Sequence, residues 1–486
     1  MVSQEKQNYS IKNLLIVGGG TAGKLFIKDA QKRDDCQIVG VIDDKLKIDS
    51  EILNGIKVLG KIVDLSKILE IYKIDRIIIA IPSVRGDLIR KIVLSLYDYP
   101  NQLDIYLIPR TSEIILGGKV SYEDAREISL TDLVGENIIK NDQLKINKSL
   151  KGRNILISGG GGSIGSELSK QIFLSIPKKI IIIDNSEKNL FYVESELQRL
   201  KEINNTTKIK IILGDIKNKL LLEEVFLKEH IDTVFHAAAY KHVPILEDNP
   251  YEAATNNILG TYNVCLCAKN FKIQKLILIS TDKAVKPINI MGKTKRIAEL
   301  IMMYFNTTFK TNFSAVRFGN VFNSSGSAVK IFINQIENNL PILITDQKMS
   351  RFFITIPEAV HLILQAWYYS KKNQIYMLEM GESVNILDLA KCIATIKKSN
   401  TKTIIKTIGI RKGEKINEAL YDQNSEKKIK TSHKKIFSLS STKKINYQKL
   451  EKQINQLFEL LQKREVQNHS IKGNNILKKQ LNKILD

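Results

Sequence analysis

A glycine-rich turn between an apolar strand and a helix constrains this chain more than any other feature of its sequence. Residues 154–158 (NILIS) read as a strand, and GGGGSIG follows before a helical pattern begins near Ser166. Gly159, Gly162 and Gly165 allow a tight turn and let a phosphate group approach backbone N–H groups at the helix N-terminus. The pattern predicts a strand–turn–helix unit of a parallel α/β sheet that binds a dinucleotide.

The acidic residue after the next strand predicts which dinucleotide binds. The strand expected at residues 179–183 ends in Asp184, nineteen residues after Gly165. A carboxylate there can bind the ribose 2′-hydroxyl and would repel a 2′-phosphate, so NAD is favoured over NADP. Two further strands end in residues that can line the cofactor. One is followed by Asp215, whose carboxylate could reach the adenine, and the other by the small residues Ala237, Ala238 and Ala239.

A second stretch, residues 276–299, carries the candidate chemistry. Four apolar residues read as a buried strand, and Thr281, Asp282 and Lys283 stand where it ends, which is where ligands bind in an open α/β sheet. On the helix expected next, Met291 and Lys295 are four residues apart and therefore point the same way. For any one residue a place in an ordinary surface loop is as good an interpretation, but the order of the whole set favours a site.

Composition excludes several classes of protein. The chain has 486 residues, 43% of them hydrophobic, which suffices for the cores of two or three domains. No apolar run reaches the ~18 residues that a membrane helix needs, and the first ten residues lack a signal peptide's apolar stretch, so a cytoplasmic location is expected. The four cysteines, at 36, 265, 267 and 392, are too few and too scattered for a disulfide framework or a zinc site, and no metal is expected.

The net charge of +23 raises the alternative of a nucleic-acid-binding protein. Lysine is spread along the chain with isoleucine and asparagine, and no basic stripe interleaved with aromatic residues appears before the C-terminal end. We therefore expect a solvated basic surface, loosely attracted to phosphates or anionic lipid, and no specific nucleic-acid partner.

A weaker unit of the same kind precedes the glycine-rich turn. An apolar strand at residues 13–17 leads into the glycine turn at 18–23 and a helical pattern, and further strands are expected at 37–42 and 76–81. Nothing in this unit resembles a catalytic set, so binding of a nucleotide or small regulatory ligand and a purely structural role both stay open. The irregular stretch 111–148 is expected to connect it to the next domain.

Eight short sequences occur together between residues 154 and 422: GGGGSIGSEL, HAAAYKHVPILE, NNILGTYN, STDKAVKPINIMGKTKR, VRFGNVFNSSGS, RFFITIPEA, MGESVNILDLA and IRKGEKINEAL. This region resembles the nucleotide-sugar 4,6-dehydratases within the extended short-chain dehydrogenase/reductase superfamily. The N-terminal unit, with GGGTAGK and DLVGEN, is similar to the extra domain of the larger, usually membrane-bound members, without their preceding transmembrane helices. The resemblance implies an α/β fold with two Rossmann-like, doubly wound parallel-sheet domains, the second with a small C-terminal substrate-binding part.

The resemblance implies NAD-dependent dehydration of UDP-N-acetylglucosamine or a close UDP-sugar. C4 is oxidised by hydride transfer, C5 loses a proton, O6 leaves as water, and the hydride returns to C6. Lys283 would take the C5 proton, Asp282 would protonate O6, and both need pKa values near neutrality. Thr281 would bind the C4 oxygen, and Lys295 the nicotinamide ribose. Most of the superfamily has a tyrosine base at the position of Met291. The methionine-type dehydratases share the methionine of this chain, and with it the C5 configuration is expected to be retained.

Further contacts are also implied by the resemblance. The remaining cofactor contacts would come from Ser163, Ile164, Ile216 and Asn257. The UDP-sugar would be bound by Lys241, His242, Arg317, Asn320, Ser327, Arg351 and Arg411. Of these, the three arginines would hold the diphosphate, because a guanidinium fork suits a pyrophosphate.

Three segments and two alternative functions complete the predictions. We expect an N-terminal Rossmann-like domain with its connector at 1–148, an NAD-binding catalytic domain at 149–423 and a basic helical tail at 424–486, in a homo-oligomer.

Two other functions are alternatives to the dehydratase. One is an NAD-dependent nucleotide-sugar C4-epimerase, which needs no acid and base at C5 and C6, and the other is a non-catalytic NAD-binding regulator of glycan assembly. Asp282 and Lys283 argue against both.

Overall fold

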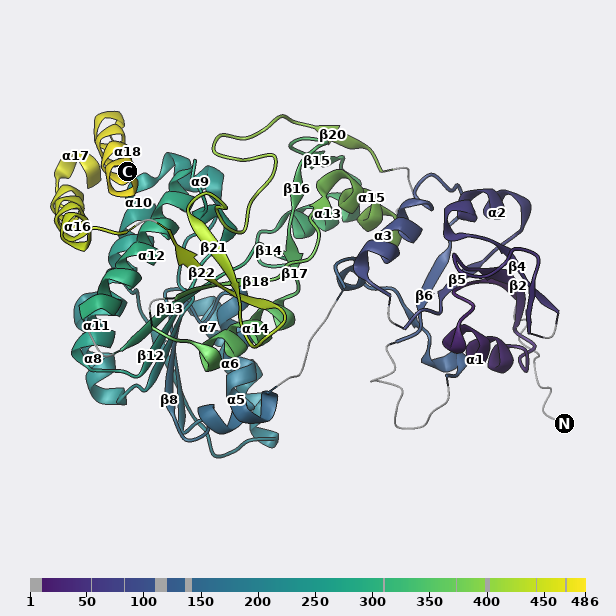
Figure 1. The fold of residues 1–486 in the computed structure, drawn as a ribbon, viewed down its shortest axis with the longest axis horizontal. Helices are drawn as coiled ribbons and strands as arrows, with labels where there is room; N and C mark the ends of the chain where they lie inside the picture. Colours follow the sequence, from purple (N-terminus) through teal and green to yellow (C-terminus); the bar gives the residue numbers. More distant parts are fainter. Residues whose placement is uncertain are drawn as a thin grey trace. The chain divides into compact units, whose positions relative to one another are not determined.

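The computed structural model of the chain describes residues 11–53, 55–82, 84–109, 120–135, 142–308, 311–372, 374–397, 403–442, 444–467 and 470–486 (Figure 1). These fall into two compact units. The first contains residues 1–136, 331–343 and 386–406, and the second contains residues 137–330, 344–385 and 407–486. The first ten residues, and residues 111–119 and 136–141 of the expected connector, lie outside the described ranges.

The first unit is built on a mixed sheet. Within the described residues its strands lie in the order β3 (Glu51–Leu53), β4 (Ile56–Gly60), β2 (Cys36–Ile42), β1 (Lys12–Val17), β5 (Arg76–Ile79), β6 (Asp104–Leu107) and β7 (Arg126–Glu127). Its helices are α1 (Thr21–Ala30), η1 (Ile62–Asp64), α2 (Leu65–Ile71), α3 (Gly86–Leu94), η2 (Tyr122–Asp124), η3 (Leu130–Leu133) and α15 (Ile386–Ile396). The central strands are parallel and β3 and β7 are antiparallel edges. Buried residues of β1 pack on α1.

The second unit has a larger sheet whose order contains a reversal. Among the described residues it runs β10 (Lys208–Leu213), β9 (Lys179–Asp184), β8 (Asn154–Ser158), β11 (Thr233–His236), β12 (Lys275–Ile279), β13 (Asn312–Arg317), β18 (Gln374–Leu378), β22 (Ile436–Ser441) and β21 (Glu426–Lys430). All pairs up to β18 are parallel, and the last two strands are antiparallel. The chain order reverses between β8 and β11, which makes that point the expected place for a ligand. The predicted α/β fold is confirmed.

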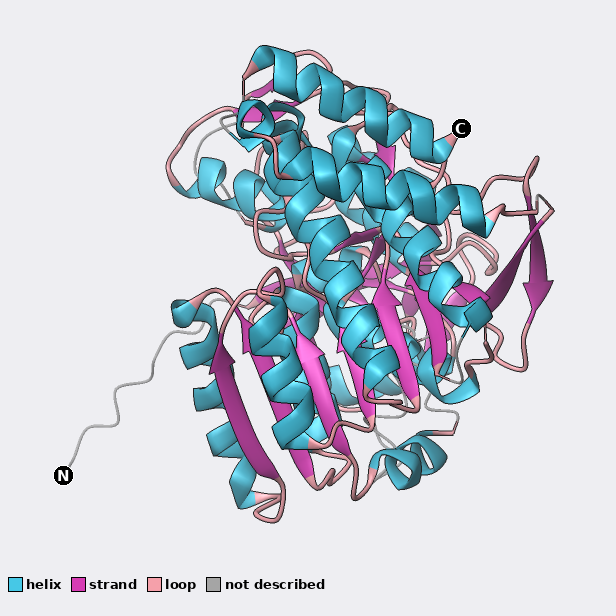
Figure 2. Ribbon diagram, turned by 90° about the vertical axis from the view of Figure 1, so that its left-hand side faces the viewer, coloured by secondary structure: helices cyan, strands magenta, loops and turns pink. Residues whose placement is uncertain are grey.

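Helices cover both faces of this sheet (Figure 2). One face packs on α8 (Lys219–Glu229), α11 (Gly260–Asn270) and α12 (Ile290–Thr308), with α16 (Tyr447–Leu461) and α18 (Ile471–Leu485) beyond them. The other packs on α5 (Gln143–Leu150), α6 (Ser163–Phe173), α7 (Glu187–Arg199) and α14 (Ile356–Tyr369). A sheet buried on both faces explains why its strands read as continuous apolar runs.

Shorter elements complete the chain. They are η4 (Leu200–Glu202), α9 (Val243–Asp248), α10 (Pro250–Ala254), the π-helix η5 (Thr255–Leu259), η6 (Asp282–Ala284), β14 (Asn320–Val321), α13 (Ala328–Glu337), β15 (Ile342–Ile344), β16 (Ser350–Arg351), β17 (Phe353–Ile354), β19 (Val384–Asn385), β20 (Ile405–Thr407) and α17 (Arg464–Gln467). Across the described ranges, none of the helices combines the length and the apolar character needed to cross a bilayer.

Two expected elements differ in the structure. The apolar pattern at 315–321 predicts one strand, but β13 ends at Arg317 and Asn320–Val321 form the separate strand β14, which pairs with β17. Between them lies Gly319, where a Cβ would lie 2.8 Å from Phe352 Cβ. Residues 426–441 form β21 and β22 where helices were expected. Pairing of β22 with β18 satisfies the backbone of this lysine-rich segment, and its buried Ile436 and Leu439 pack on the sheet, so tertiary context overrides composition.

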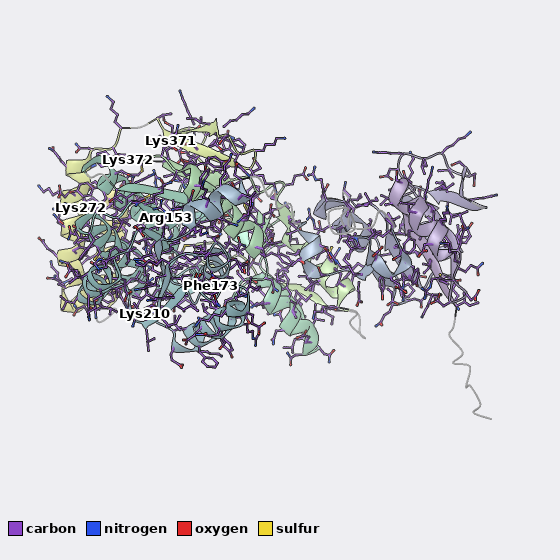
Figure 3. The ribbon with its side chains drawn as sticks, turned by 90° about the horizontal axis from the view of Figure 1, so that it is seen from below. Arg153, Phe173, Lys210, Lys272, Lys371 and Lys372 are labelled. Carbon is purple, nitrogen blue, oxygen red and sulfur yellow. The ribbon has the colours of Figure 1, made fainter. Side chains whose placement is uncertain are left out.

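Part of the basic surface lies at the end of the second unit's sheet where the parallel strands begin, opposite the end that carries the glycine turn. Figure 3 looks at the second unit from the end where its parallel strands begin, and it labels Arg153, Lys272 and Lys371 there. These residues precede β8, β12 and β18, and both lysines are exposed. Because ligands of such sheets bind at the opposite, carboxyl ends of the strands, these charges belong to the solvated surface.

We expect Gly165→Ala to destabilise the second unit by about 1–3 kcal/mol, as overpacking against rigid neighbours does. The new Cβ would lie 2.1 Å from the carbonyl oxygen of Gly159, a backbone atom that cannot move aside. Urea unfolding followed by circular dichroism would measure the loss. Gly162→Ala is the matched control, because its Cβ would meet the same oxygen at an ordinary 3.4 Å. Equal losses in the two variants would contradict the prediction.

Candidate active site

The glycine turn forms a cradle of bare backbone at the carboxyl end of β8. Gly159 has a φ of +71°, and a Cβ on it would lie 2.4 Å from the backbone nitrogen of Ala238. Gly165 lets α6 begin directly against the turn. Asp184 closes the cradle, since its Oδ2 accepts a hydrogen bond from Gly161 N at 2.9 Å. Space that any side chain would fill, a helix N-terminus and a carboxylate fit the pyrophosphate and ribose of a dinucleotide.

Asp184 keeps capacity for a ligand. Its second oxygen, Oδ1, accepts a hydrogen bond from Ser186 N at 2.9 Å. A carboxylate has about four acceptor positions, so a ribose hydroxyl can still donate to it. Both carboxylate oxygens of Asp215 already have partners in Lys217. Oδ1 accepts a hydrogen bond from Lys217 N at 2.8 Å, and Oδ2 lies 3.4 Å from the Lys217 amine. Ile216 is buried against Gly260.

The loop after β11, with Ala237, Ala238 and Ala239, is held in place by Asn257. The Asn257 side chain accepts a hydrogen bond from Tyr240 N at 2.8 Å and donates to Tyr240 O at 3.0 Å. It is buried and also donates to the Thr294 hydroxyl on α12 at 3.0 Å. This side chain therefore anchors the loop, and the direct cofactor contact expected of Asn257 stays a prediction.

The loop of residues 323–327 brings several predicted residues together. Ser325 N donates to the hydroxyl of Ser163 at 3.0 Å, at the start of α6. A Cβ on Gly326 would lie 2.4 Å from His242 Cε1, so the imidazole lies against this loop. Ser327 Oγ is buried and has no hydrogen-bond partner among the described residues, which leaves it available to a ligand. Ile164 packs on the core, and Lys241 is exposed.

The loop after β12 holds an acid and an amine together. Lys283 Nζ lies 3.0 Å from Asp282 Oδ1 and donates to Asn320 Oδ1 at 2.9 Å. The Thr281 hydroxyl donates to the same Asp282 oxygen at 2.8 Å. Asp282 is 0% exposed, and within the described residues its Oδ2 has no hydrogen-bond partner. A buried, half-satisfied carboxylate beside an amine is an arrangement typical of proton-transfer sites.

Helix α12 places Met291 and Lys295 beside this loop. Both side chains are buried, and Lys295 Nζ donates to the carbonyl oxygen of Ile279, the last residue of β12, at 2.7 Å. Burial lowers the pKa of Lys295 to about 8, against the opposing effect of Glu299. The amine is therefore mainly charged at neutral pH. The thioether of Met291 cannot exchange a proton as a tyrosine hydroxyl would.

A buried ion pair lies next to the loop that carries Thr281, Asp282 and Lys283, which we call the reacting loop. Glu299 on α12 accepts two hydrogen bonds of 2.7 Å from Arg317 at the end of β13, and Ser280 donates to Glu299 at 2.6 Å. Arg317 also donates to Glu426 at 2.9 Å and is 1% exposed. The guanidinium of Arg317 is enclosed and already paired, so the contact with a diphosphate expected of it is not supported by this arrangement.

The charge of this ion pair persists in acid. Burial alone would raise the pKa of Glu299, but the charges of Arg317 and Arg296 and the hydrogen bond from Ser280 lower it to about 2. Ionised Glu299 therefore contributes its full stability above the unfolded pKa near 4.5, and this contribution is lost as the pH falls toward 2.

The other two predicted arginines differ from each other. Arg351 is buried, and its guanidinium donates to the carbonyl oxygens of Lys415 and Ile416 at 2.7 Å. It anchors a chain segment, so the diphosphate contact expected of Arg351 is not supported. Arg411 is exposed in the loop before that segment, and its expected role stays a prediction.

Sequence reasoning missed three residues with buried side chains: His236, Glu299 and Glu418. His236 at the end of β11 joins Ser158 Oγ at 2.7 Å to Thr261 Oγ1 at 2.9 Å. Burial and the charge of Lys295 lower its pKa to about 3, so it is neutral at pH 7. No local pattern marks their roles, since the Ser158 and Thr261 partners of His236 and the Arg317 partner of Glu299 lie 78, 25 and 18 residues away. Across the described ranges, no group of three or more His, Cys, Asp or Glu could hold a metal ion.

Comparisons with known proteins agree with this geometry. The family model described as polysaccharide biosynthesis protein matches residues 155–441, and one described as CoA-binding domain matches residues 2–109. The chain is 38% identical to the capsular polysaccharide biosynthesis protein CapD of Staphylococcus aureus, over 85% of this chain and 69% of that protein. It is also 38% identical to a UDP-glucose 4-epimerase of Rickettsia bellii, over 55% and 77%. The solved structure of Pen from Bacillus thuringiensis is 34% identical, with a TM-score of 0.55, over 60% and 90%.

We expect Glu299→Gln to lower the free energy of unfolding by about 3–5 kcal/mol, the usual loss when one partner of a buried ion pair is removed. Arg317 would remain buried with Glu426 alone as its charged partner and would lose its two-bond pairing with an ionised Glu299. Urea unfolding near pH 7 would measure the change. Glu224→Gln is the control, because Glu224 pairs with Lys228 on an exposed helix face and should contribute less than about 1 kcal/mol. A loss in Glu299→Gln as small as in the control would contradict the prediction.

Proposed function

Because the chain belongs to the polysaccharide biosynthesis protein family, we propose that it dehydrates UDP-N-acetylglucosamine, or a close UDP-sugar, to the 4-keto-6-deoxy sugar. Members of this family are enzymes that modify nucleotide sugars, within the short-chain dehydrogenase/reductase superfamily. The proposed reaction uses NAD and retains the configuration at C5. The observation that carries the proposal is the pair of a buried Asp282 and a half-buried Lys283 at the carboxyl end of β12.

The cofactor proposed for the cradle is NAD. Bare backbone at the turn receives the pyrophosphate, and Asp184 accepts a hydrogen bond from the ribose 2′-hydroxyl and repels a 2′-phosphate. Bound NAD supplies the oxidation at C4 and the reduction at C6. Lys295, held at the end of β12, binds the nicotinamide ribose and contributes its positive charge.

The proton transfers fall to the pair on the reacting loop. Lys283 in its neutral form takes the C5 proton, which the ketone at C4 makes acidic. Asp282 in its protonated form donates to O6, which leaves as water, and its unpartnered Oδ2 is the oxygen free to do so. Lys283 then returns a proton to C5 from the same face, so one base suffices and the configuration is retained.

The alternative is a nucleotide-sugar C4-epimerase. The identity with a UDP-glucose 4-epimerase over 55% of this chain favours it. Epimerisation uses the same cofactor cradle but requires no acid and base acting at C5 and C6. A paired acid and amine at the reacting loop are therefore better explained by dehydration.

Incubation with UDP-N-acetylglucosamine tests the function. We expect mass spectrometry to detect loss of one water, and NMR of the product formed in deuterated water to show the D-series ring with deuterium at C5. Met291→Tyr should give the same stereochemistry, because Lys283 still serves as the only base at C5. A product of unchanged mass with inverted C4 would favour the epimerase, and an L-series ring would contradict the single-base mechanism.

We expect Lys283→Ala and Asp282→Asn each to lower kcat by roughly 10²–10⁴-fold, the usual loss for a general acid or base. Calorimetry should show that both variants still bind NAD and the UDP-sugar. The control is Lys286→Ala on the same loop, whose side chain is 60% exposed and pairs with Asp422. Turnover near that of the wild type in either variant would remove the assigned role from that residue.

A further inference from the structure

Residues 413–415 are distant in sequence from the reacting loop but lie against the chain that leads from this loop to helix α12. The amine of Lys415 donates hydrogen bonds to the carbonyl oxygens of Val285 and Lys286, at 3.0 and 2.9 Å. The side-chain amide of Asn289, which directly precedes α12, donates to the carbonyl oxygen of Gly413 at 2.8 Å. The two segments are therefore tied together at both ends of residues 285–289.

The chain after Lys283 makes a strained turn. Lys286 has a φ of +41°, a left-handed conformation that is unfavourable for a residue with a side chain. Pro287 follows and has no backbone N–H to close the turn. Backbone carbonyl groups in such a turn need donors from outside it, and the amine of Lys415 is a donor to two of them. The conformation of the turn therefore depends on this contact.

Lys415 is itself held from the other side. The buried guanidinium of Arg351 donates to the carbonyl oxygens of Lys415 and Ile416, both at 2.7 Å. The Lys415 side chain is 20% exposed, and its amine lies 3.8 Å from Oε2 of Glu418, whose side chain is 3% exposed. Because the backbone and the amine both have buried partners, Lys415 is a fixed support, unlike a lysine whose side chain moves freely in solvent.

A shift of the strained turn would move the reacting pair. The carbonyl oxygen of Lys283 lies 2.2 Å from the place that a Cβ on Gly292 would take, so the backbone of Lys283 is in close contact with the first turn of α12. Helix α12 and residues 413–415 thus confine the same short piece of chain. Loosening one support allows the amine of Lys283 to move, and a displacement of about 1 Å can lower a rate about 100-fold.

We propose that residues 413–415 position the reacting loop, and that Lys415 is the positioning residue whose amine keeps Asp282 and Lys283 in their reacting geometry. Lys415 acts through the backbone of the loop, without touching the reacting atoms. The consequence for catalysis rests on the proposed dehydration, whereas the hold on the loop exists without a substrate.

Hydrogen–deuterium exchange of the full-length protein, read by mass spectrometry, tests the hold on the loop without catalysis. The backbone amides of Asp282, Ala284 and Val285 are hydrogen-bonded, so their exchange reports opening of the loop. We expect Lys415→Met, which keeps the length of the side chain and removes its donors, to speed exchange in peptides covering 281–290 about tenfold. Lys415→Arg keeps charged donors and should restore most of the protection. Lys412→Met is the matched control, because Lys412 is an exposed lysine close by in the same stretch of chain.

The second measurement is the kinetics of dehydration with UDP-N-acetylglucosamine. Lys415→Met should lower kcat about 10–100-fold and change KM and the affinity for NAD by less than about threefold. Lys415→Arg should recover most of kcat, and Lys412→Met should match the wild type. A role of Lys415 in stability alone would lower the free energy of unfolding and leave the kcat of the folded protein unchanged, which would overturn the proposal.

Asn289→Asp tests the second contact between the two segments. The new carboxylate keeps the acceptor for Gly292 N, which lies 2.7 Å from Asn289 Oδ1, and loses the donor to the carbonyl oxygen of Gly413. We expect faster exchange in residues 281–290 and a lower kcat, in the same direction as in Lys415→Met. Should Lys415→Met fail to fold, Asn289→Asp carries the test, and unchanged exchange in it overturns the proposal.

The outcomes separate this inference from the proposed function. The inference is overturned if exchange of residues 281–290 in Lys415→Met stays within about twofold of the wild type, or if Lys412→Met speeds it equally. Faster exchange in Lys415→Met with unchanged turnover also overturns the positioning role. If exchange is faster in Lys415→Met but the wild type does not dehydrate UDP-sugars, the hold on the loop is supported and the proposed function is rejected.

Discussion

The buried ion pair of Glu299 and Arg317 is the interaction on which the active site depends. Enclosing two charges costs several kcal/mol per ion unless each is paired and hydrogen-bonded. Here Arg317 donates twice to Glu299 and once to Glu426, and the Ser280 hydroxyl also donates to Glu299. Because Ser280 directly precedes the reacting loop, the same carboxylate fixes helix α12, strand β13 and the start of that loop.

Next to this ion pair, the hydrogen-bonding capacity of Asp282 is only partly used. Asp282 is buried with one oxygen bonded to Lys283 and Thr281 and the other without a partner in the described chain. Low local polarity strengthens the bonded half and makes the free oxygen unfavourable until a donor arrives. In the proposed reaction this oxygen carries the proton that Asp282 donates to O6, so a bond to the substrate would satisfy it.

Cofactor and substrate groups meet because the sheet reverses its strand order between β8 and β11. The glycine turn follows one of these strands and the alanine loop follows the other, with Asn257 tying that loop to α12. The carboxyl end of β12 lies next in the sheet, so the reacting loop stands beside the cradle. A single topological feature thus brings three distant loops to one place.

The sequence by itself determined the parallel α/β fold, the cradle and the reacting pair, because each depends on neighbouring residues. Apolar runs predict buried strands, the glycines from Gly159 to Gly165 predict the turn, and Asp282 and Lys283 are adjacent in the chain. Tertiary structure alone decided that Arg317 pairs with Glu299 and Glu426, that Arg351 binds backbone, and that residues 426–441 extend the sheet. The physical reason is that a buried charge takes whichever partner the fold places beside it, and local sequence carries no record of partners that lie 18 or 109 residues away.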